Sequence, residues 1–88
     1  MRATPKELII EHYADHGEDI IFANGYDSAI IGIDPATFRV IYSRNKTIES
    51  FVEDGWDVEE AVEFCEYNVF SAWIGEKTPI WVEDFKWQ

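Results

Sequence analysis

Residues 29–42, AIIGIDPATFRVIY, carry the clearest strand signal in the chain. The runs from Ala29 to Ile33 and from Phe38 to Tyr42 are rich in β-branched and aromatic residues, which favour extended backbone. Between them, residues 34–37 (DPAT) have the side chains of a tight turn. The stretch therefore predicts an antiparallel hairpin, the firmest strand pairing in this sequence.

Two elements are expected before the hairpin. Residues 4–7 (TPKE) have the form of a capping box with proline at the first helical position, so a helix is predicted from there to near Gly17. Residues 19–23 precede Asn24-Gly25, a pair typical of type I′ turns. That pattern predicts an extra strand near Ile20, paired with the segment after the turn. The alternative is a loop at the Asn-Gly pair after a short helical or irregular stretch.

Two helices and a strand are expected after the hairpin. Apolar residues at i, i+3, i+4 spacing predict a short amphipathic helix over residues 46–54, ended by Gly55. Residues 57–60 (DVEE) offer an aspartate N-cap and early glutamates, which predict a longer helix that reaches about Trp73 before Gly75 stops it. Residues 78–83 (TPIWVE) are typical of a strand with its proline near the start.

The predicted order is α-β-β-α-α-β, with the extra strand near Ile20 as an option. We therefore expect a small α+β domain in which about three helices pack an antiparallel sheet of three to four strands. The 88 residues fit a single domain, because two cores of ordinary size need more chain. Cys65 has no second cysteine to pair with, and neither a signal peptide nor a membrane-spanning run is recognisable, so a cytoplasmic protein is expected.

Acidic residues dominate the charged side chains. The chain has 18 Asp and Glu against seven Lys and Arg, a net charge of −11, which repels phosphate backbones and anionic lipids. Direct binding to nucleic acid or to a membrane is therefore not expected. Half of the acids lie in residues 47–76, where no Lys or Arg occurs: Glu49, Glu53, Asp54, Asp57, Glu59, Glu60, Glu63, Glu66 and Glu76.

The predicted helix that begins near Asp57 divides this acidic segment into faces. At about 100° per residue, one third of the helix is apolar and should face the core, namely Val58, Ala61, Val62, Cys65, Val69 and Ala72. The opposite side carries carboxylates, namely Glu59, Glu63 and Glu66, with Glu60 further round. The remaining side carries Phe64, Tyr67 and Phe70. These aromatic side chains are either covered by a neighbouring helix or exposed as anchors for a partner.

No catalytic motif, phosphate-binding loop or cofactor motif is recognisable, so neither catalytic residues nor cofactors are expected. His12 and His16 are four residues apart, as in some zinc-binding helices, but Tyr13 stands where those helices have glutamate. Two surface histidines without a metal are the favoured interpretation. Cys65 lies within the apolar stripe, which favours a buried, inert thiol.

Four stretches carry a resemblance to a known family: GYDSAIIG (25–32), GWDVEEAVEF (55–64), YNV (67–69) and GEKTPI (75–80). They resemble a family of small uncharacterised proteins encoded by tailed bacteriophages and prophages, over roughly the last three quarters of the chain. The resemblance implies a phage or prophage origin and no chemistry, because the family has no assigned activity. By analogy, small acidic phage proteins often bind and block a host factor, as anti-CRISPR proteins do, and some imitate nucleic acid.

The leading hypothesis is a non-enzymatic binder or inhibitor of a host or phage protein, acting in the host cytoplasm. A partner protein with a basic surface would bind the acidic helix face and its aromatic neighbours, namely Glu59, Glu60, Glu63, Glu66, Phe64, Tyr67 and Phe70. The alternative is a structural or accessory module that self-associates, for example as a homodimer, with the charge serving solubility only. An enzyme that uses paired carboxylates is the least supported class.

Overall fold

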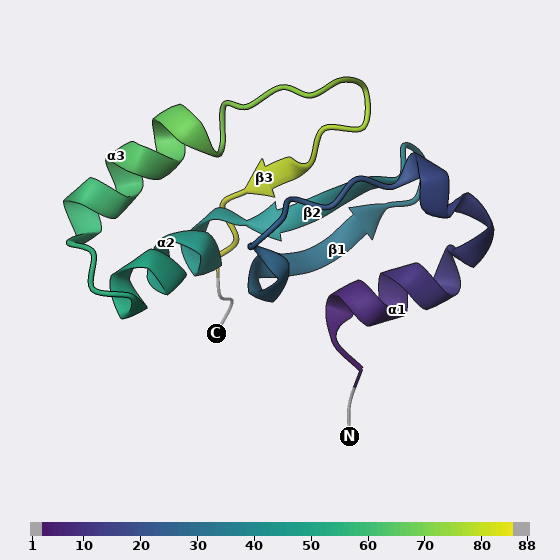
Figure 1. Ribbon diagram of the computed structural model, residues 1–88, viewed down its shortest axis with the longest axis horizontal. Coiled ribbons are helices and arrows are strands. Elements are labelled where there is room, and N and C mark those ends of the chain that lie inside the picture. Colours follow the sequence, from purple (N-terminus) through teal and green to yellow (C-terminus); the bar gives the residue numbers. More distant parts are fainter. Residues whose placement is uncertain (1–2, 86–88) are drawn as a thin grey trace.

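The computed structural model of the protein describes residues 3–85 (Figure 1). Its elements are, in order, α1 (Pro5–His12), the 3₁₀ helices η1 (Ala14–Asp19) and η2 (Asp27–Ala29), β1 (Ile30–Asp34), β2 (Arg39–Ser43), α2 (Arg44–Glu53), α3 (Val58–Asn68) and β3 (Ile80–Val82). The expected α+β class and the order α-β-β-α-α-β are confirmed.

The predicted hairpin is present and forms one side of a three-stranded sheet. β1 pairs with β2 antiparallel, with Ile30 opposite Tyr42. Asp34 closes the turn twice: its carbonyl accepts from Phe38 N–H at 2.7 Å, and its carboxylate accepts from Ala36 N–H at 2.9 Å. The bond from Ala36 is the main reason why the pKa of Asp34 lies below its usual value, since it stabilises the ionised carboxylate.

The third strand corrects one expectation. β3 lies beside β2 and runs parallel to it, with Ile41 opposite Ile80 and Ser43 opposite Val82, so the sheet is mixed rather than antiparallel. The reason is the connection between them, residues 44–79, which contains α2 and α3. A chain that leaves one end of a sheet through helices can return to the other end and re-enter parallel. Figure 1 shows this excursion through α2, α3 and the following loop.

The optional extra strand near Ile20 does not form. Residues 20–23 are irregular, Gly25 turns the chain with a φ of 93°, and η2 then leads directly into β1. Side chains of this segment pack on the buried core instead of pairing at a sheet edge. The Ala23 N–H donates to the Tyr42 hydroxyl at 2.7 Å, so a side chain supplies the partner that a neighbouring strand would have supplied. The alternative, an irregular stretch before a loop, is the one observed.

Local sequence signals locate the starts of the first two helices more closely than the end of α1. The capping box is present, with Glu7 N–H donating to Thr4 Oγ1 at 3.2 Å, but α1 ends at His12 and η1 replaces the predicted last turns. α2 begins slightly earlier than predicted because Ser43 caps it, accepting from Lys46 N–H at 3.0 Å. The order of the helices is therefore as expected, although their bounds differ.

α3 follows its predicted N-cap Asp57, although the Asp57 side chain makes no capping bond. The helix ends at Asn68 rather than near Trp73. There the Phe70 N–H reaches back to the Cys65 carbonyl at 2.8 Å, and the chain turns away so that Phe70 packs against β3. The buried stripe of α3 and the residues after it is also narrower than predicted: Ala61, Cys65 and Val69 are buried, whereas Val58, Val62 and Ala72 are exposed.

The core lies between the sheet, α1 and the segment before η2. Its buried members come from α1, η2 and the β1–β2 hairpin, namely Ile9, Ala29, Ile30, Val40 and Tyr42, and partly buried side chains of the segment before η2 pack against them. α2 and α3 pack against each other at one end of the sheet, at left in Figure 1. The two helices therefore present their outer sides to solvent at that end of the molecule.

Candidate protein-binding site

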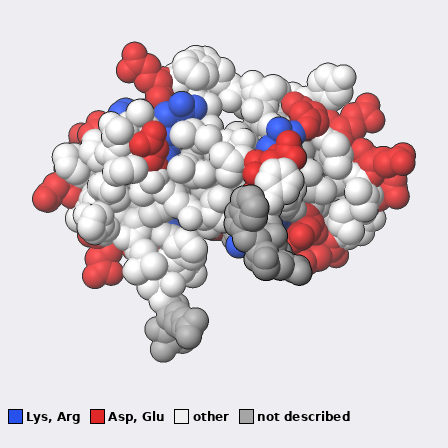
Figure 2. Space-filling model, turned by 180° about the vertical axis from the view of Figure 1, so that it is seen from behind, with Lys and Arg blue, Asp and Glu red and all other residues white. Residues whose placement is uncertain are grey.

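The outward side of α3 carries carboxylates around one tyrosine. Ala61 and Cys65 are fully buried, so side chains on the opposite side of the helix project into solvent. We call these exposed residues the acidic face: Glu59, Glu60, Glu63, Glu66 and Tyr67. Tyr67 is 77% exposed and follows Glu60 and Glu63 by seven and four positions, a spacing that places all three on one side of the helix. In Figure 2 many red carboxylates lie at the right, the end that carries α2 and α3.

The three predicted aromatic anchors have different surroundings. Phe64 is 37% exposed and packs on Phe51 and Trp56, with ring centroids 5.5 Å and 5.1 Å away. Phe70 is half-buried against β3. Tyr67 is the most exposed of the three. Neighbouring elements therefore cover Phe64 in part and Phe70 more fully, and Tyr67 is the ring that remains accessible to a partner.

Arg44 joins the acidic face to the body of the molecule. Its guanidinium pairs with the Glu66 carboxylate and lies over the ring of Phe70, 4.6 Å from the centroid. Glu66 thus already has a basic partner within the chain. Over residues 3–85, no Lys or Arg forms an ion pair with the other three carboxylates of the acidic face. These three are the ones left to attract a base on another molecule.

A series of aromatic ring contacts connects α3 to the sheet. Trp81 of β3 stacks on the buried Tyr42 of β2, with ring centroids 4.6 Å apart. Trp81 also meets Tyr26 edge-on at 5.7 Å, and Tyr26 lies 6.3 Å from Phe51 of α2, which contacts Phe64. Aromatic pairs at such distances contribute about 0.5–1.5 kcal/mol each beyond their buried area. The helix pair is therefore held against the sheet by ring contacts.

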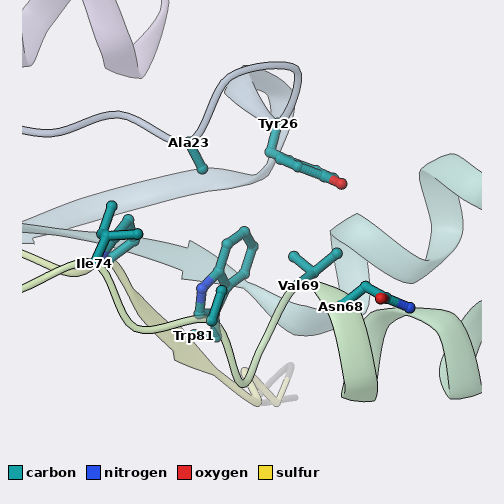
Figure 3. Close-up of a pocket in the computed structure, with 8 residues that line it drawn as sticks. Ala23, Tyr26, Asn68, Val69, Ile74 and Trp81 are labelled. Carbon is teal, nitrogen blue, oxygen red and sulfur yellow. The ribbon is translucent and has the colours of Figure 1, made fainter.

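Two hollows adjoin the acidic face and meet at Asn68. The first is a cavity of about 150 Å³ at the C-terminal end of α3, where the apolar walls include Tyr26, Val69, Ile74 and Trp81 (Figure 3). The second is a shallow depression along α3, lined by Trp56, Glu60, Glu63, Phe64 and Tyr67. Asn68 lines both hollows. The acidic face thus continues into an apolar cavity.

Sequence reasoning identified the acidic face but not the cavity. The carboxylates share one helix, so their common side follows from the helical period alone. The cavity instead combines residues from three separate stretches, around Tyr26, around Val69 and around Trp81. It exists because β3 returns parallel to β2 and brings Trp81 beside the end of α3. The one local signal was the tryptophan in a short strand, which marks a ring packed on a sheet.

The cysteine and the two histidines lie outside the acidic face. Cys65 is buried, and this burial, with a smaller effect from the charge of Glu66, raises the pKa of its thiol, so the poorly nucleophilic neutral form is favoured. His12 and His16 are exposed, and His16 stacks on Phe38 at 4.8 Å. Within residues 3–85, no three His, Cys, Asp or Glu side chains gather closely enough to hold a metal ion.

Comparison with protein-family models, with curated proteins and with solved structures gave no match to this chain. In the described part of the chain, no helix has both the length and the apolar character needed to cross a membrane. The acidic face and the adjoining cavity are therefore the basis for assigning a function.

Proposed function

We propose that the protein is a non-enzymatic binding protein whose acidic face binds a basic surface of another protein. The observation that supports this most strongly is the exposed Tyr67 beside Glu60 and Glu63, on a helix whose opposite side is buried. Tyrosine is enriched among the residues that dominate interface energies, and carboxylates around the ring select a partner of opposite charge. Like charges at Glu59 and Glu63 destabilise the helix by roughly 0.2–0.5 kcal/mol, so folding does not account for them.

The spacing of the charges supports a partner that also binds nucleic acid. From Asp57 to Glu66, five carboxylates span about 13.5 Å of helix at a rise of about 1.5 Å per residue. This is one charge per roughly 3 Å, close to the distance of about 3.4 Å between phosphates along one DNA strand. A basic groove that accepts a nucleic acid backbone would meet a similar charge density on α3.

We also propose a phage or prophage origin, with a role in blocking a host or phage protein in the host cytoplasm. The stretches GYDSAIIG (25–32), EEAVEF (59–64) and GEKTPI (75–80) support this origin. The second of them contains three carboxylates of the acidic face, Glu59, Glu60 and Glu63. An anti-defence protein, such as an anti-CRISPR-like inhibitor, would use the acidic face to occupy the basic groove of its target.

Capture of the partner at increasing salt tests this function. Immobilised protein is incubated with a bacterial host lysate, and the retained partner is expected to elute at moderate salt, because charges more than about 8 Å apart are largely screened at 0.15 M. The variant Glu59→Gln/Glu63→Gln should retain several-fold less partner, since it removes two acidic-face charges that have no basic partner within residues 3–85.

A matched control separates the acidic face from total charge. Glu11→Gln/Glu18→Gln removes the same charge from exposed residues of α1 and η1 and should retain the partner normally. Retention that is indifferent both to salt and to the α3 substitutions would contradict the proposed function.

Self-association is the second candidate, and the exposure of Trp73 and Tyr67, 70% and 77%, favours it. In that case the charge serves solubility only. Sedimentation equilibrium distinguishes the two candidates. A dimer that persists in Glu59→Gln/Glu63→Gln but dissociates in Trp73→Ser or Tyr67→Ser would favour the self-associating module, whereas a monomer at all concentrations would exclude it.

A further inference from the structure

We infer that the cavity at the end of α3 receives one apolar side chain, aromatic or branched aliphatic, from a basic segment of the partner protein. This inference rests on the proposed function and specifies the chemistry of the partner. Three properties of the cavity support it: its size and lining, the way its walls are held, and its continuity with the acidic face.

The size and lining of the cavity suit a single ring. Its volume is about 150 Å³, and apolar cavities of about this size in other proteins hold one benzene molecule. Its lining is mostly apolar, and the polar side-chain groups among the lining residues are the Tyr26 hydroxyl, the Asn68 amide and the Trp81 indole N–H. Figure 3 shows the side chains of Tyr26, Val69 and Trp81 grouped around a common space at the end of α3. A phenyl or leucine-sized side chain therefore fits, and a charged group would lose its hydration there.

The walls are held in place before any partner binds. Trp81 is fixed by three neighbouring rings, those of Tyr42 at 4.6 Å, Phe70 at 5.3 Å and Tyr26 at 5.7 Å. Val69 is buried at the end of α3. A preformed cavity requires little reorganisation on binding, so most of the apolar area that a ligand buries contributes to affinity. Ile74, 58% exposed, adds an apolar wall that solvent reaches.

The charges around the cavity specify a basic segment. The cavity and the depression along the acidic face share Asn68, and Glu60 lies eight residues before it, about 12 Å along the helix at about 1.5 Å per residue. An extended segment covers that distance in about four residues at about 3.3 Å each. Lysine or arginine within about four positions of the apolar anchor would therefore meet Glu60 and Glu63. A second copy of this chain fits poorly, because each copy carries a net charge of −11.

Three synthetic peptides test the inference by titration into ¹⁵N-labelled protein. They are acetyl-FGKKGKK-amide, acetyl-AGKKGKK-amide and acetyl-FGEEGEE-amide, so anchor and charge vary separately. The first peptide should bind at least about tenfold more tightly than the second, because burying a phenyl side chain has an effect of this size. It should also shift the amide signals of Tyr26 and Ile74 and the indole signal of Trp81. The acidic peptide should show no saturable binding.

Two substitutions and a control test whether the difference in affinity between the phenylalanine and alanine peptides arises at the cavity. Ala72 lines the cavity from an exposed position, so Ala72→Phe places a ring there without replacing a core residue. This variant should bind the phenylalanine and alanine peptides equally and keep the wild-type affinity for the latter. Ile74→Ser, which removes an apolar wall of the cavity, should lower the affinity for the phenylalanine peptide and leave the affinity for the alanine peptide unchanged. The control Ala36→Phe adds the same ring at the β1–β2 turn and should behave as wild type.

The outcomes separate failure of the inference from failure of the proposed function. Equal affinity of the two basic peptides for the wild-type protein would overturn the inference and leave the acidic face as a binding surface. Equal affinity of the basic and acidic phenylalanine peptides would overturn both, since charge would then select nothing. Binding by no peptide would overturn the inference, while partner capture at increasing salt would still decide the function. A dimer that Ala72→Phe dissociates would overturn the inference by making a second copy the occupant.

Discussion

Phe38 is the non-glycine residue with a positive φ in residues 3–85, at 61°. It follows the turn of the β1–β2 hairpin, a position where glycine is usual because an ordinary side chain crowds the backbone there. The contacts of the Phe38 ring offset the cost of this backbone conformation. The rings of Tyr13 and His16 lie 5.5 Å and 4.8 Å from it, and the Lys77 ammonium lies 5.5 Å away. At this residue, side-chain packing has overridden the backbone preference.

Two substitutions at Phe38 separate these effects. Phe38→Ala and Phe38→Gly both remove the ring contacts, but only the glycine variant also relieves the backbone. The glycine variant should therefore be more stable than the alanine variant by about 1 kcal/mol, although both should be less stable than the wild-type protein. Urea unfolding measures the difference. An alanine variant as stable as the glycine variant would show that the backbone at residue 38 is not strained.

Cys65 predicts a pH dependence of stability. Burial is the main reason that the pKa of its thiol is raised above the usual value of 9.0, so the folded chain binds this proton more tightly than the unfolded chain. The resulting contribution to stability is complete below about pH 9 and is lost as the pH rises through the folded pKa.

The free energy of unfolding should therefore fall more steeply above about pH 9 in wild type than in Cys65→Ala. Tyr42, whose pKa is also raised by burial, remains in both proteins. The charge of Cys65 adds to the effect of burial in raising the pKa of Tyr26, so the difference between the two proteins reports the thiol together with its effect on Tyr26. If the free energy of unfolding, measured in urea, changes with pH in the same way in both proteins, the raised pKa of the Cys65 thiol is contradicted.

At the scale of elements, the turn between α2 and α3 sets how these helices meet. Gly55 has a φ of 105°, its N–H donates to the Val52 carbonyl at 3.0 Å, and the Trp56 N–H donates to the Phe51 carbonyl at 3.0 Å. These two bonds form a Schellman motif. The hydrophobic contact that accompanies the motif is also present, since the rings of Phe51 and Trp56 lie 5.0 Å apart. The turn that ends α2 therefore also orders a wall of the depression beside the acidic face.

Gly55→Ala should destabilise the protein by about 1 kcal/mol, because alanine adopts the left-handed conformation only with strain. Gly17→Ala is the matched control: Gly17 lacks a positive φ, and an added methyl group would meet no atom within 4 Å. Thermal unfolding should show a lower unfolding temperature for Gly55→Ala and an unchanged unfolding temperature for Gly17→Ala. Equal effects would contradict this role for the turn.

At the scale of the whole molecule, the separation of interacting residues along the chain explains what could be predicted. The hairpin over residues 29–42 and the capping box at Thr4 depend on near neighbours, and both were predicted. The irregular path of residues 20–23 depends on distant contacts, such as Ala23 N–H with the Tyr42 hydroxyl, and the sequence left it as one of two alternatives. The parallel direction of β3 also depends on distant contacts, and it was missed. No local pattern encodes a bond between such distant residues.

The same distinction applies to the candidate site, where features that depend on one helix were predictable and those that depend on distant contacts were not. One helical period was enough to predict that the carboxylates of the acidic face share a side of α3. The period could not decide whether Phe64 and Phe70 are covered, because that depends on where α2 and β3 pack. The cavity beside Asn68 was unpredictable for the same reason, since Tyr26 and Trp81 reach it from separate parts of the chain.

Mapping the contact surface of a captured partner tests most directly the central claim, that the acidic face of α3 is the binding surface. The measurement is the change in each backbone amide signal of ¹⁵N-labelled protein when unlabelled partner is added. The account predicts that the largest changes fall on residues 59–68 and weaken in Glu59→Gln/Glu63→Gln. Largest changes on α1 or on the β1–β2 hairpin, with residues 59–68 unaffected, would contradict it.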